Sequence, residues 1–272
     1  DEMGGDLEEL KQAIRPDTIL ISIMFANNEI GTMEPVREIG EIAKEHGILF
    51  HTDAVQAFGQ IPIQVDELHI DMLSASGHKL NGPKGIGFLY IRKGLRLKNF
   101  VHGGAQERKR RAGTENVPGI VGLGTAVARA IRTMEERTKL EKEIRDYLID
   151  RVLKEIPYTK LNGHPTDRLP NNANFSFQFI EGESLLIRLG YEGNLCIQRI
   201  CMYLGITGSV TCASGHRLPH EIAHGSLRLT INEEISKEDV DYVVDSLKEI
   251  VEGLRNMSPL YEDFVKKQEK NV

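Results

Sequence analysis

Long apolar runs and cysteines are scarce in this 272-residue chain, and their scarcity excludes several classes of protein. No stretch approaches the roughly 20 apolar residues that a membrane-spanning helix needs, and we expect no signal peptide. The three cysteines, Cys196, Cys201 and Cys212, lack metal-ligand spacing. We therefore expect no membrane partner, no metal site and a reducing, cytoplasmic location.

A surplus of positive charge is also lacking. The net charge is -6 and the isoelectric point is near 5.9, so nucleic acid is not expected as a partner. The basic run 108–111 is a local exception, for which a solvated loop and a contact with phosphate or substrate both stay open. Hydrophobic residues make up 40% and charged residues 27%, which is typical of a soluble globular protein with one large or two modest domains.

Apolar runs alternate with a helical pattern in the first part of the chain. Residues 18–24 predict a fully buried strand, and residues 85–91 predict another strand. Between them, Pro35 stands at the first position of a predicted helix, which Gly47 ends before a strand begins at Ile48. This order predicts an α/β domain with a mostly parallel sheet covered by helices.

The pattern changes from Pro118 onward. A long helical stretch, interrupted or continuous, runs to about Glu155, and residues 174–179 alternate as a half-buried strand does. Residues 226–230 alternate too, and Ser236 precedes a helix whose apolar face is formed by Val240, Val243, Val244, Leu247 and Ile250. We expect a partial large domain over residues 1–130 and a small α+β domain over residues 131–272.

Two polar segments each follow an apolar run. The segment 51–56 (HTDAVQ) follows 47–50, and the segment 76–79 (SGHK) follows 70–74. In an α/β domain both would lie at the carboxyl ends of strands, where such sheets bind ligands. Pyridoxal phosphate needs a lysine for a Schiff base and a carboxylate for its pyridinium nitrogen. Asp53 and Lys79 together predict a pyridoxal phosphate site, although a lone aspartate at a strand end is more often a cap.

Neighbouring side chains fit the same cofactor. Gln56 can donate to the phenolic oxygen, and Ser76 and His78 lie within reach of the phosphate if Lys79 reaches the aldehyde carbon. Lys79 would also carry protons during the reaction. The glycine-rich segment 82–87 fits a phosphate loop, but a tight turn into a strand explains it as well.

Six motifs resemble the cysteine desulfurases of the nitrogen-fixation and iron–sulfur assembly type. These enzymes belong to the class V aminotransferase branch of fold-type-I pyridoxal phosphate enzymes. The resemblance runs nearly end to end, in order and at family spacing. The motifs are ANNEIG at 26–31, HTDAVQ at 51–56, SGHK at 76–79, GPKG at 82–85, RAGTEN at 111–116 and HGSLR at 224–228.

The resemblance implies a role for individual residues. Lys79 would be the Schiff-base lysine and a catalytic residue together with His78, and Asp53 would be the partner of the pyridinium nitrogen. Asn28 and Gln56 would contact the phenolic side of the cofactor. Ser76 and His78 would bind its phosphate, and Thr114 would reach the phosphate of the neighbouring subunit in a homodimer. Asn27 and Arg228 would bind substrate, with Arg228 holding its carboxylate.

Two departures from the family pattern bear on activity. We expect the chain to lack the family's amino-terminal part, which supplies a small-residue phosphate loop and a histidine stacked on the cofactor. Family members also carry a Ser/Gly-rich loop typified by SSGSACTSGS, whose cysteine takes sulfur from the substrate. Here the corresponding stretch 194–217 resembles nothing in the family, and the nucleophile's position holds Met202.

Back-translation accounts for this aberrant stretch. One synonymous choice of codons for residues 194–203, read one base later, encodes ICASSGSAC, and permitted codons up to Arg217 continue it as TSGSLDPSHVLLAIG. That is the family's loop and the helix after it. We infer two compensating single-base changes, either in the gene or in its sequencing, so that all three cysteines are products of a shifted frame.

The sequence therefore predicts a pyridoxal phosphate-dependent cysteine desulfurase whose activity is impaired. The family reaction converts L-cysteine to L-alanine and passes persulfide sulfur to an acceptor or scaffold protein for iron–sulfur cluster or thio-cofactor assembly. Two alternatives stay open. One is an inactive remnant or a dimerisation partner without turnover, and the other is a different class V enzyme, such as an aminotransferase or a selenocysteine lyase.

Overall fold

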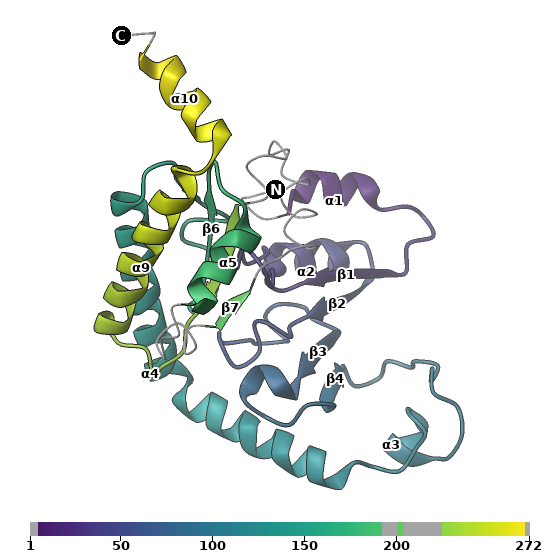
Figure 1. The fold of residues 1–272 in the computed structure, drawn as a ribbon. Coiled ribbons are helices and arrows are strands. Elements are labelled where there is room, and N and C mark those ends of the chain that lie inside the picture. The colour runs from purple at the N-terminus through teal and green to yellow at the C-terminus, as the bar shows by residue number, and fades with distance from the viewer. Residues whose placement is uncertain (1–4, 192–200, 204–224, 270–272) are drawn as a thin grey trace. The chain divides into compact units, whose positions relative to one another are not determined.

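The computed structural model describes residues 5–191, 201–203 and 225–269, and its contacts divide the chain into two compact units. Gly5–Ala26 and Glu34–Glu135 form the amino-terminal unit, and Asn27–Met33 belongs with the chain from Glu136 onward, the carboxyl-terminal unit. Figure 1 shows the elements of both units. Within the described ranges, no helix is both long enough and apolar enough to cross a membrane.

A four-stranded sheet with the order β1-β2-β3-β4 forms the centre of the amino-terminal unit. β1 is parallel to β2 and β2 is parallel to β3, whereas β4 runs antiparallel to β3. Only a short 3-10 helix, η1, and a turn connect β3 to β4, which is too little chain for a parallel crossover. The mostly parallel α/β sheet that the sequence predicts is thus confirmed.

The elements of the amino-terminal unit are α1 (Leu7–Ala13), β1 (Leu20–Met24), α2 (Val36–Glu45), β2 (Leu49–Asp53), β3 (Met72–Ser76), η1 (Gly77–Leu80), β4 (Gly87–Ile91), α3 (Gln106–Lys109) and the first part of α4 (Val117–Glu155).

The two faces of this sheet differ because successive side chains of a strand point to opposite sides. On one face Ile21, Phe50 and Leu73 are buried in a core that includes residues of α2. On the other face Leu20 and Leu89 are 44% and 48% exposed. The expectation that residues 18–24 form a fully buried strand is therefore wrong, because α2 covers only one side of β1.

The carboxyl-terminal unit contains a second sheet with the order β5-β6-β8-β7, in which every pairing is antiparallel. Helices α4 and α9 contribute Leu148, Val152, Val243 and Leu247 to its core, in which these four side chains are fully buried. The remaining elements are β5 (Thr159–Leu161), β6 (Asn172–Phe177), α5 (Gly182–Tyr191), β7 (Cys201–Tyr203), β8 (Ser226–Thr230), α9 (Lys237–Arg255) and α10 (Pro259–Glu269).

The predicted start of α9 is confirmed in detail. The Ser236 side chain accepts a hydrogen bond from the amide of Asp239, and the Asp239 carboxylate accepts one from the Ser236 amide. This reciprocal capping box satisfies two amides that the helix itself leaves without partners. The expected half-buried strand at 174–179 is instead β6, Asn172–Phe177, in which all six residues are buried. Its polar face is buried because the side chains on it bond to other parts of the chain.

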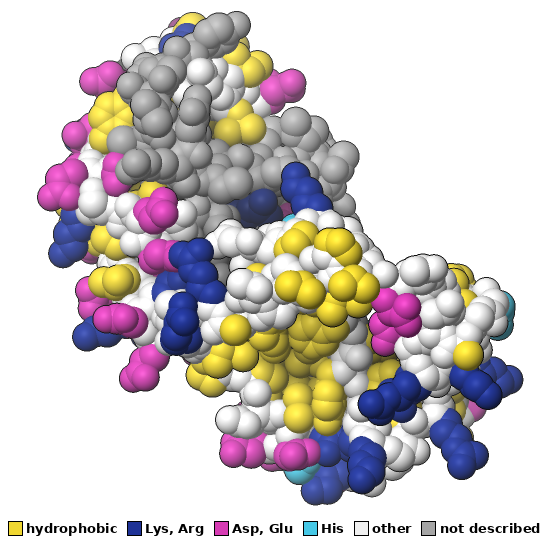
Figure 2. Space-filling model, turned by 90° about the horizontal axis from the view of Figure 1, so that it is seen from below, with side chains coloured by type: hydrophobic (Ala, Val, Ile, Leu, Met, Phe, Trp, Pro, Cys, Tyr) yellow, Lys and Arg dark blue, Asp and Glu magenta, His cyan; other side chains and the backbone are white. Residues whose placement is uncertain are grey.

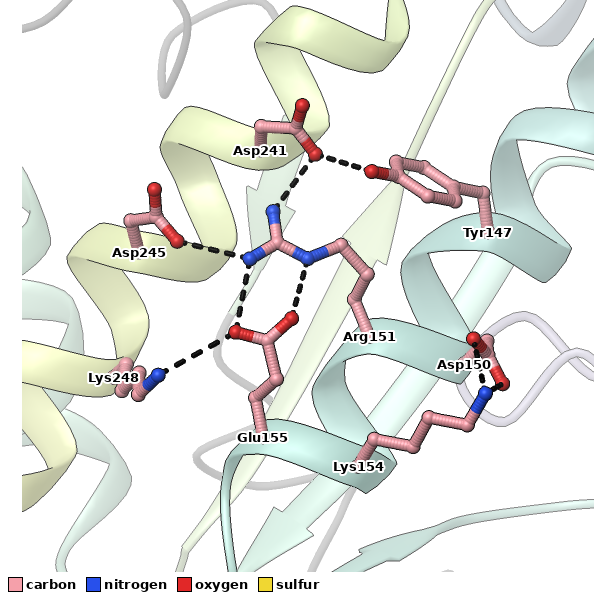
Figure 3. A network of polar contacts seen from close by, with 8 residues as sticks. All are labelled: Tyr147, Asp150, Arg151, Lys154, Glu155, Asp241, Asp245 and Lys248. Atoms are coloured by element: carbon pink, nitrogen blue, oxygen red, sulfur yellow. Dashed lines mark hydrogen bonds and ion pairs between the residues drawn. The ribbon is translucent and has the colours of Figure 1, made fainter.

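A polar network joins α4 to α9 (Figure 3). Arg151 on α4 donates to Glu155 on the same helix and to Asp241 and Asp245 on α9, at N–O distances between 2.6 and 3.0 Å. The Tyr147 hydroxyl donates to Asp241 as well. These bonds hold the two helices in register on the outside of the buried core.

Candidate active site

Asp53 and Lys79 extend from the same edge of the sheet in the amino-terminal unit. Asp53 is the last residue of β2, and Lys79 lies in η1, which follows β3 directly. Because β2 and β3 are neighbours and parallel, their carboxyl ends lie side by side. In the register of the sheet, Asp53 is paired with Ser74, two residues before the end of β3. The structure thus places both groups where the sequence predicts them.

The carboxylate of Asp53 is exposed and bonded to the chain that follows it. Its Oδ1 accepts a hydrogen bond from the amide of Val55 at 2.9 Å. Gln56 lies in the turn immediately after, which the bond from the Ala57 amide to the Ala54 carbonyl closes. A carboxylate has two oxygens, so one bond to Val55 is compatible with a second partner.

Ser76 and His78 lie together at the end of β3. The Ser76 Oγ and the His78 Nδ1 are 2.7 Å apart. The backbone between them is tightly packed, since a Cβ at Gly77 would lie 3.0 Å from the Ile86 side chain and 3.1 Å from the Pro83 carbonyl oxygen. Both Gly77 and the turn after it are therefore needed to present Ser76, His78 and Lys79 close together.

One polar group on this face has no role in the sequence-based interpretation. His51 on β2 lies between two hydroxyls of the neighbouring strands, with 2.7 Å from Nδ1 to Ser22 Oγ and 2.7 Å from Nε2 to Ser74 Oγ. Burial lowers the pKa of His51 below its ordinary value of 6.5, against the opposing effect of the Asp53 carboxylate. The imidazole is accordingly neutral at pH 7. It lies on the same face as Asp53, two residues before it.

The groups at this sheet edge fit pyridoxal phosphate. A carboxylate at the end of one strand suits a pyridinium nitrogen, and a lysine at the end of the next strand suits an aldehyde. The hydroxyl and imidazole of Ser76 and His78 suit a phosphate. The neutral His51 adds no positive charge that would compete with a pyridinium for Asp53.

Thr114 and the basic run 108–111 lie in the same unit. Thr114 is exposed in the segment between α3 and α4, and all four basic side chains of the run are exposed. Arg108 and Lys109 adopt positive φ angles of 55° and 65°. The exposure agrees with a solvated loop, and it also leaves these side chains accessible to a ligand.

Asn27 and Asn28 belong to the carboxyl-terminal unit, as Arg228 does. The Asn27 side chain is used locally, because its Oδ1 accepts bonds from the amides of Glu29 at 2.8 Å and Ile30 at 3.0 Å. Asn28 is exposed, and its backbone carbonyl accepts a bond from Arg228 Nη1 at 2.7 Å. The structure thus brings together a predicted cofactor residue and the predicted substrate-carboxylate residue, which are 200 positions apart in the sequence.

The segment Asn27–Met33 also accepts hydrogen bonds from side chains to which the sequence-based interpretation gave no role. Asn172 and Asn174 both donate to the Glu29 carbonyl, and Arg168 donates to the Ile30 carbonyl at 2.9 Å. Burial, and then the nearby Arg145, lowers the pKa of Arg168 to about 10, so it remains charged at pH 7. Two polar residues spaced two apart in a strand are the only sequence signal, and it does not identify what they bind.

Met202 lies in β7, where its backbone is paired with Leu229, the residue after Arg228. Apart from residues 201–203, the aberrant stretch 194–217, with Cys196 and Cys212, lies outside the described residues, and so does His224. The shifted-frame interpretation therefore stays a prediction from the sequence.

Comparison with known proteins identifies the family. The profile of the family Aminotransferase class-V matches residues 1–243. The cysteine desulfurase IscS of Methanosarcina thermophila is 58% identical over 255 residues, which cover 93% of this chain and 62% of that protein. The cysteine desulfurase IscS of Clostridium botulinum strain Hall is 50% identical over 284 aligned positions, covering 99% of this chain and 69% of that protein.

Solved structures agree with these sequence relatives. A NifS-like protein superimposes with a TM-score of 0.82 at 36% identity, over 92% of this chain and 65% of the other. The NifS-like protein from Rickettsia africae gives a TM-score of 0.81 at 30% identity, over 90% of this chain and 65% of the other. The chain thus spans about two thirds of the length of these relatives. By fold, family profile and identity, it belongs to the class-V aminotransferase family and, within that family, to the cysteine desulfurases of the IscS and NifS type.

Proposed function

We propose that this chain binds pyridoxal phosphate through Lys79 and Asp53 and retains the site of a cysteine desulfurase whose turnover is impaired. The substrate is L-cysteine, and the products are L-alanine and persulfide sulfur destined for a sulfur acceptor or iron–sulfur scaffold protein. The observation that carries the proposal is the placement of Asp53 and Lys79 at the carboxyl ends of two adjacent parallel strands. We further propose a cytoplasmic homodimer in which Thr114 reaches the phosphate site of the partner subunit.

Each of these side chains would serve the cofactor or the substrate. Asp53 pairs with the pyridinium nitrogen, and Gln56 and Asn28 lie on the phenolic side. Ser76 and His78 bind the phosphate, and Lys79 holds the aldehyde carbon and later moves a proton at the substrate Cα. The bound cofactor supplies an electron sink for that carbon. Asn27 and Arg228 bind the substrate, and the planar fork of the Arg228 guanidinium matches its carboxylate.

Sulfur transfer needs a group that this chain lacks at the family's position. A cysteine thiolate attacks the substrate sulfur, so that a sulfur–sulfur bond forms and the carbon–sulfur bond breaks. The electron pair of the broken bond stays with the substrate, whose Cβ takes up a proton before alanine leaves. The methionine at position 202 has a thioether, which carries no ionisable proton and does not act as a thiolate. This residue favours a second candidate function, a cofactor-binding dimerisation or scaffold partner without turnover.

Cofactor binding is tested with the variant Lys79→Ala and the control Lys84→Ala, an exposed lysine in the turn after η1. Wild type and Lys84→Ala are expected to turn yellow with pyridoxal phosphate, and borohydride is expected to attach the cofactor to Lys79, as mapped by mass spectrometry. Lys79→Ala is expected to stay colourless. A colourless wild type, or attachment spread over surface lysines, contradicts the proposed site.

Turnover is tested separately, by sulfide release from L-cysteine in the presence of a thiol reductant. Wild type is expected to release little sulfide, and release no greater than that of Lys79→Ala would favour the second candidate function, the partner without turnover. Replacement of residues 194–217 by the sequence of the restored frame, which places a cysteine at position 202, is expected to raise sulfide release above that level. If the replaced chain prefers L-selenocysteine, or aminates a keto acid instead, another class V reaction is the correct assignment.

A further inference from the structure

The segment Asn27–Met33 is held by the carboxyl-terminal unit, although both its flanks belong to the other unit. The bonds to it include side-chain donors that point at backbone carbonyls, beginning with Arg228 on Asn28. Backbone bonds complete the attachment, since the Leu169 amide donates to the Gly31 carbonyl at 2.9 Å and the Met33 amide to the Asp167 carbonyl at 2.9 Å. We call this segment the docked loop.

Two buried asparagines on β6 hold the centre of the docked loop. Asn172 Nδ2 and Asn174 Nδ2 lie 3.2 and 3.1 Å from the same acceptor, the Glu29 carbonyl oxygen. Both side chains are almost inaccessible, at 4% and 3% exposure. The loop also approaches them closely, because a Cβ at Gly31 would lie 2.5 Å from Asn172 Oδ1, and the φ of Gly31 is +77°. Only glycine fits there.

The amides are costly if their only role is to fill space. Asn172 Oδ1 is buried without a hydrogen-bond partner among the described residues, and such an orphaned acceptor costs free energy that an apolar side chain would not. The donor Nδ2 is what the residue contributes, and its acceptor is Glu29. Asn174 stands directly opposite Arg228 in the β6–β8 pairing, so the two residues project from the same face of the sheet.

These contacts form a closed path around the Arg228 guanidinium. Strand β8 presents Arg228 next to Asn174, Asn174 holds the Glu29 carbonyl, and the preceding carbonyl, that of Asn28, accepts from Arg228 Nη1. We propose that Asn172 and Asn174 are positioning residues for Arg228, acting through the Asn28–Glu29 peptide. The proposal deepens the proposed function and rests on it, because Arg228 is there the residue that binds the substrate carboxylate.

A rigid guanidinium is what such a site requires. Arginine has several rotatable bonds, and fixing them on binding costs side-chain entropy if they are free beforehand. A guanidinium already oriented by Asn28 loses less of this freedom when a carboxylate arrives. The asparagines therefore favour binding of the carboxylate without touching it.

The first test measures the free chain, so it does not depend on activity. Asn174→Ala and Asn172→Ala each remove one of the two donors to Glu29, which leaves the other donor to preserve folding. Ser176→Ala is the matched control, because Ser176 lies on the same buried face of β6 and bonds to Asn162 rather than to the docked loop. We expect roughly tenfold faster hydrogen exchange at the loop amides and faster rotation of the Arg228 guanidinium, by NMR, in both asparagine variants only.

The second test measures carboxylate binding by the cofactor-loaded chain, with L-alanine as the probe. The asparagine variants are expected to bind L-alanine roughly tenfold more weakly than wild type, and Ser176→Ala within about twofold of it. Equal exchange, rotation and affinity in all three variants would overturn the positioning role and leave a structural one. If wild type binds neither cofactor nor L-alanine, the proposed function fails, and the exchange and rotation rates still decide whether the asparagines orient Arg228.

Discussion

Glu141 is a charged residue that the fold buries inside α4. Its side chain is 2% exposed, and Arg137 Nη1, one turn earlier, lies 3.1 and 3.3 Å from its two oxygens. Burial raises the pKa of Glu141 to about 7, with a smaller contribution from Glu233, while the charge and hydrogen bond of Arg137 act in the opposite direction. Protonation of this residue is therefore coupled to folding in the neutral range.

The pH dependence of stability follows from the raised pKa. The unfolded chain ionises Glu141 near its ordinary pKa of 4.5. The contribution of protonated Glu141 to the free energy of unfolding is therefore fully present below that pH, and it is lost as the pH rises to about 7. Glu141→Gln has no carboxyl group to ionise, so its free energy of unfolding is not expected to fall in this way. Between these pH values its stability relative to wild type is expected to rise by up to about 3 kcal/mol. Urea unfolding at several pH values measures the difference.

The control for this prediction is Glu143→Gln, an exposed glutamate on the same helix. It is expected to follow wild type at every pH. Parallel pH curves for wild type and Glu141→Gln would show that Glu141 has the same pKa in the folded and unfolded chain, because Arg137 then offsets the effect of burial.

The sequence predicts single residues well where their place depends on local signals. Asp53 and Lys79 follow strands that their apolar runs mark, and the sheet edge then brings them side by side. The contact of His51 with Ser22 and Ser74 depends on the register of three strands, which no local pattern reveals. The bond from Arg228 to Asn28 spans 200 residues and needs the folded chain.

The sequence predicts a helix or strand correctly when the spacing of its apolar residues matches the side chains that the fold buries. The capped helix α9 matches its pattern because apolar side chains recur at helical spacing, and the predicted long helical stretch is one helix, α4. β6 was expected to be half-buried, because buried asparagines have the same pattern as exposed ones in a sequence. Which carboxylates of α9 face Arg151 of α4 depends on helix packing, so the network of Figure 3 is a result of the structure.

Arg151 is expected to stabilise the pairing of these two helices. Its side chain is 16% exposed and bonds to two carboxylates of α9, whereas Lys154, 73% exposed, bonds to Asp150 within α4 (Figure 3). Arg151→Met is expected to lower the free energy of unfolding by about 1 kcal/mol, and Lys154→Met by less than about 0.5 kcal/mol. Chemical denaturation at neutral pH measures both.

Acid is expected to abolish the difference in the free energy of unfolding between Arg151→Met and Lys154→Met. Hydrogen bonds from Tyr147 and then Arg151 lower the pKa of Asp241, and the hydrogen bond from Arg151 lowers that of Glu155. The contribution of these two carboxylates to the free energy of unfolding is present above the ordinary carboxyl pKa values. It is lost as the pH falls through the lowered pKa values of the folded chain. An Arg151→Met variant that is still the less stable of the two once these carboxylates are protonated would show that the arginine stem, rather than its charge, holds the helices.

At the scale of the molecule, each unit has its own core, and the chain also exposes apolar surface. Figure 2 shows hydrophobic side chains gathered over a continuous area of one face of the molecule. Exposed apolar residues in the amino-terminal unit include Leu20, Met24 and Leu89 on the edge strands β1 and β4 and Val117 and Val121 on α4. Contiguous apolar surface of this kind marks an interaction site, a ligand-binding groove or a site of aggregation.

Leu89 and Leu73 test whether the exposed apolar side chains of the edge strands β1 and β4 drive association. Leu89, on edge strand β4, is 48% exposed, and Leu73, on the neighbouring β3, is 2% exposed and belongs to the core. Leu89→Thr is expected to lower binding of an apolar dye by the folded chain and to slow its aggregation, with stability within about 0.5 kcal/mol of wild type, since threonine is favoured in strands. Leu73→Thr is expected to cost about 2 to 5 kcal/mol, because it removes core contacts and buries a hydroxyl. Static light scattering and dye fluorescence measure the first effect and urea unfolding the second.

Unchanged dye binding and aggregation in Leu89→Thr would assign the association to the exposed face of α4 instead. In that case Val121→Thr is the variant that lowers dye binding and slows aggregation.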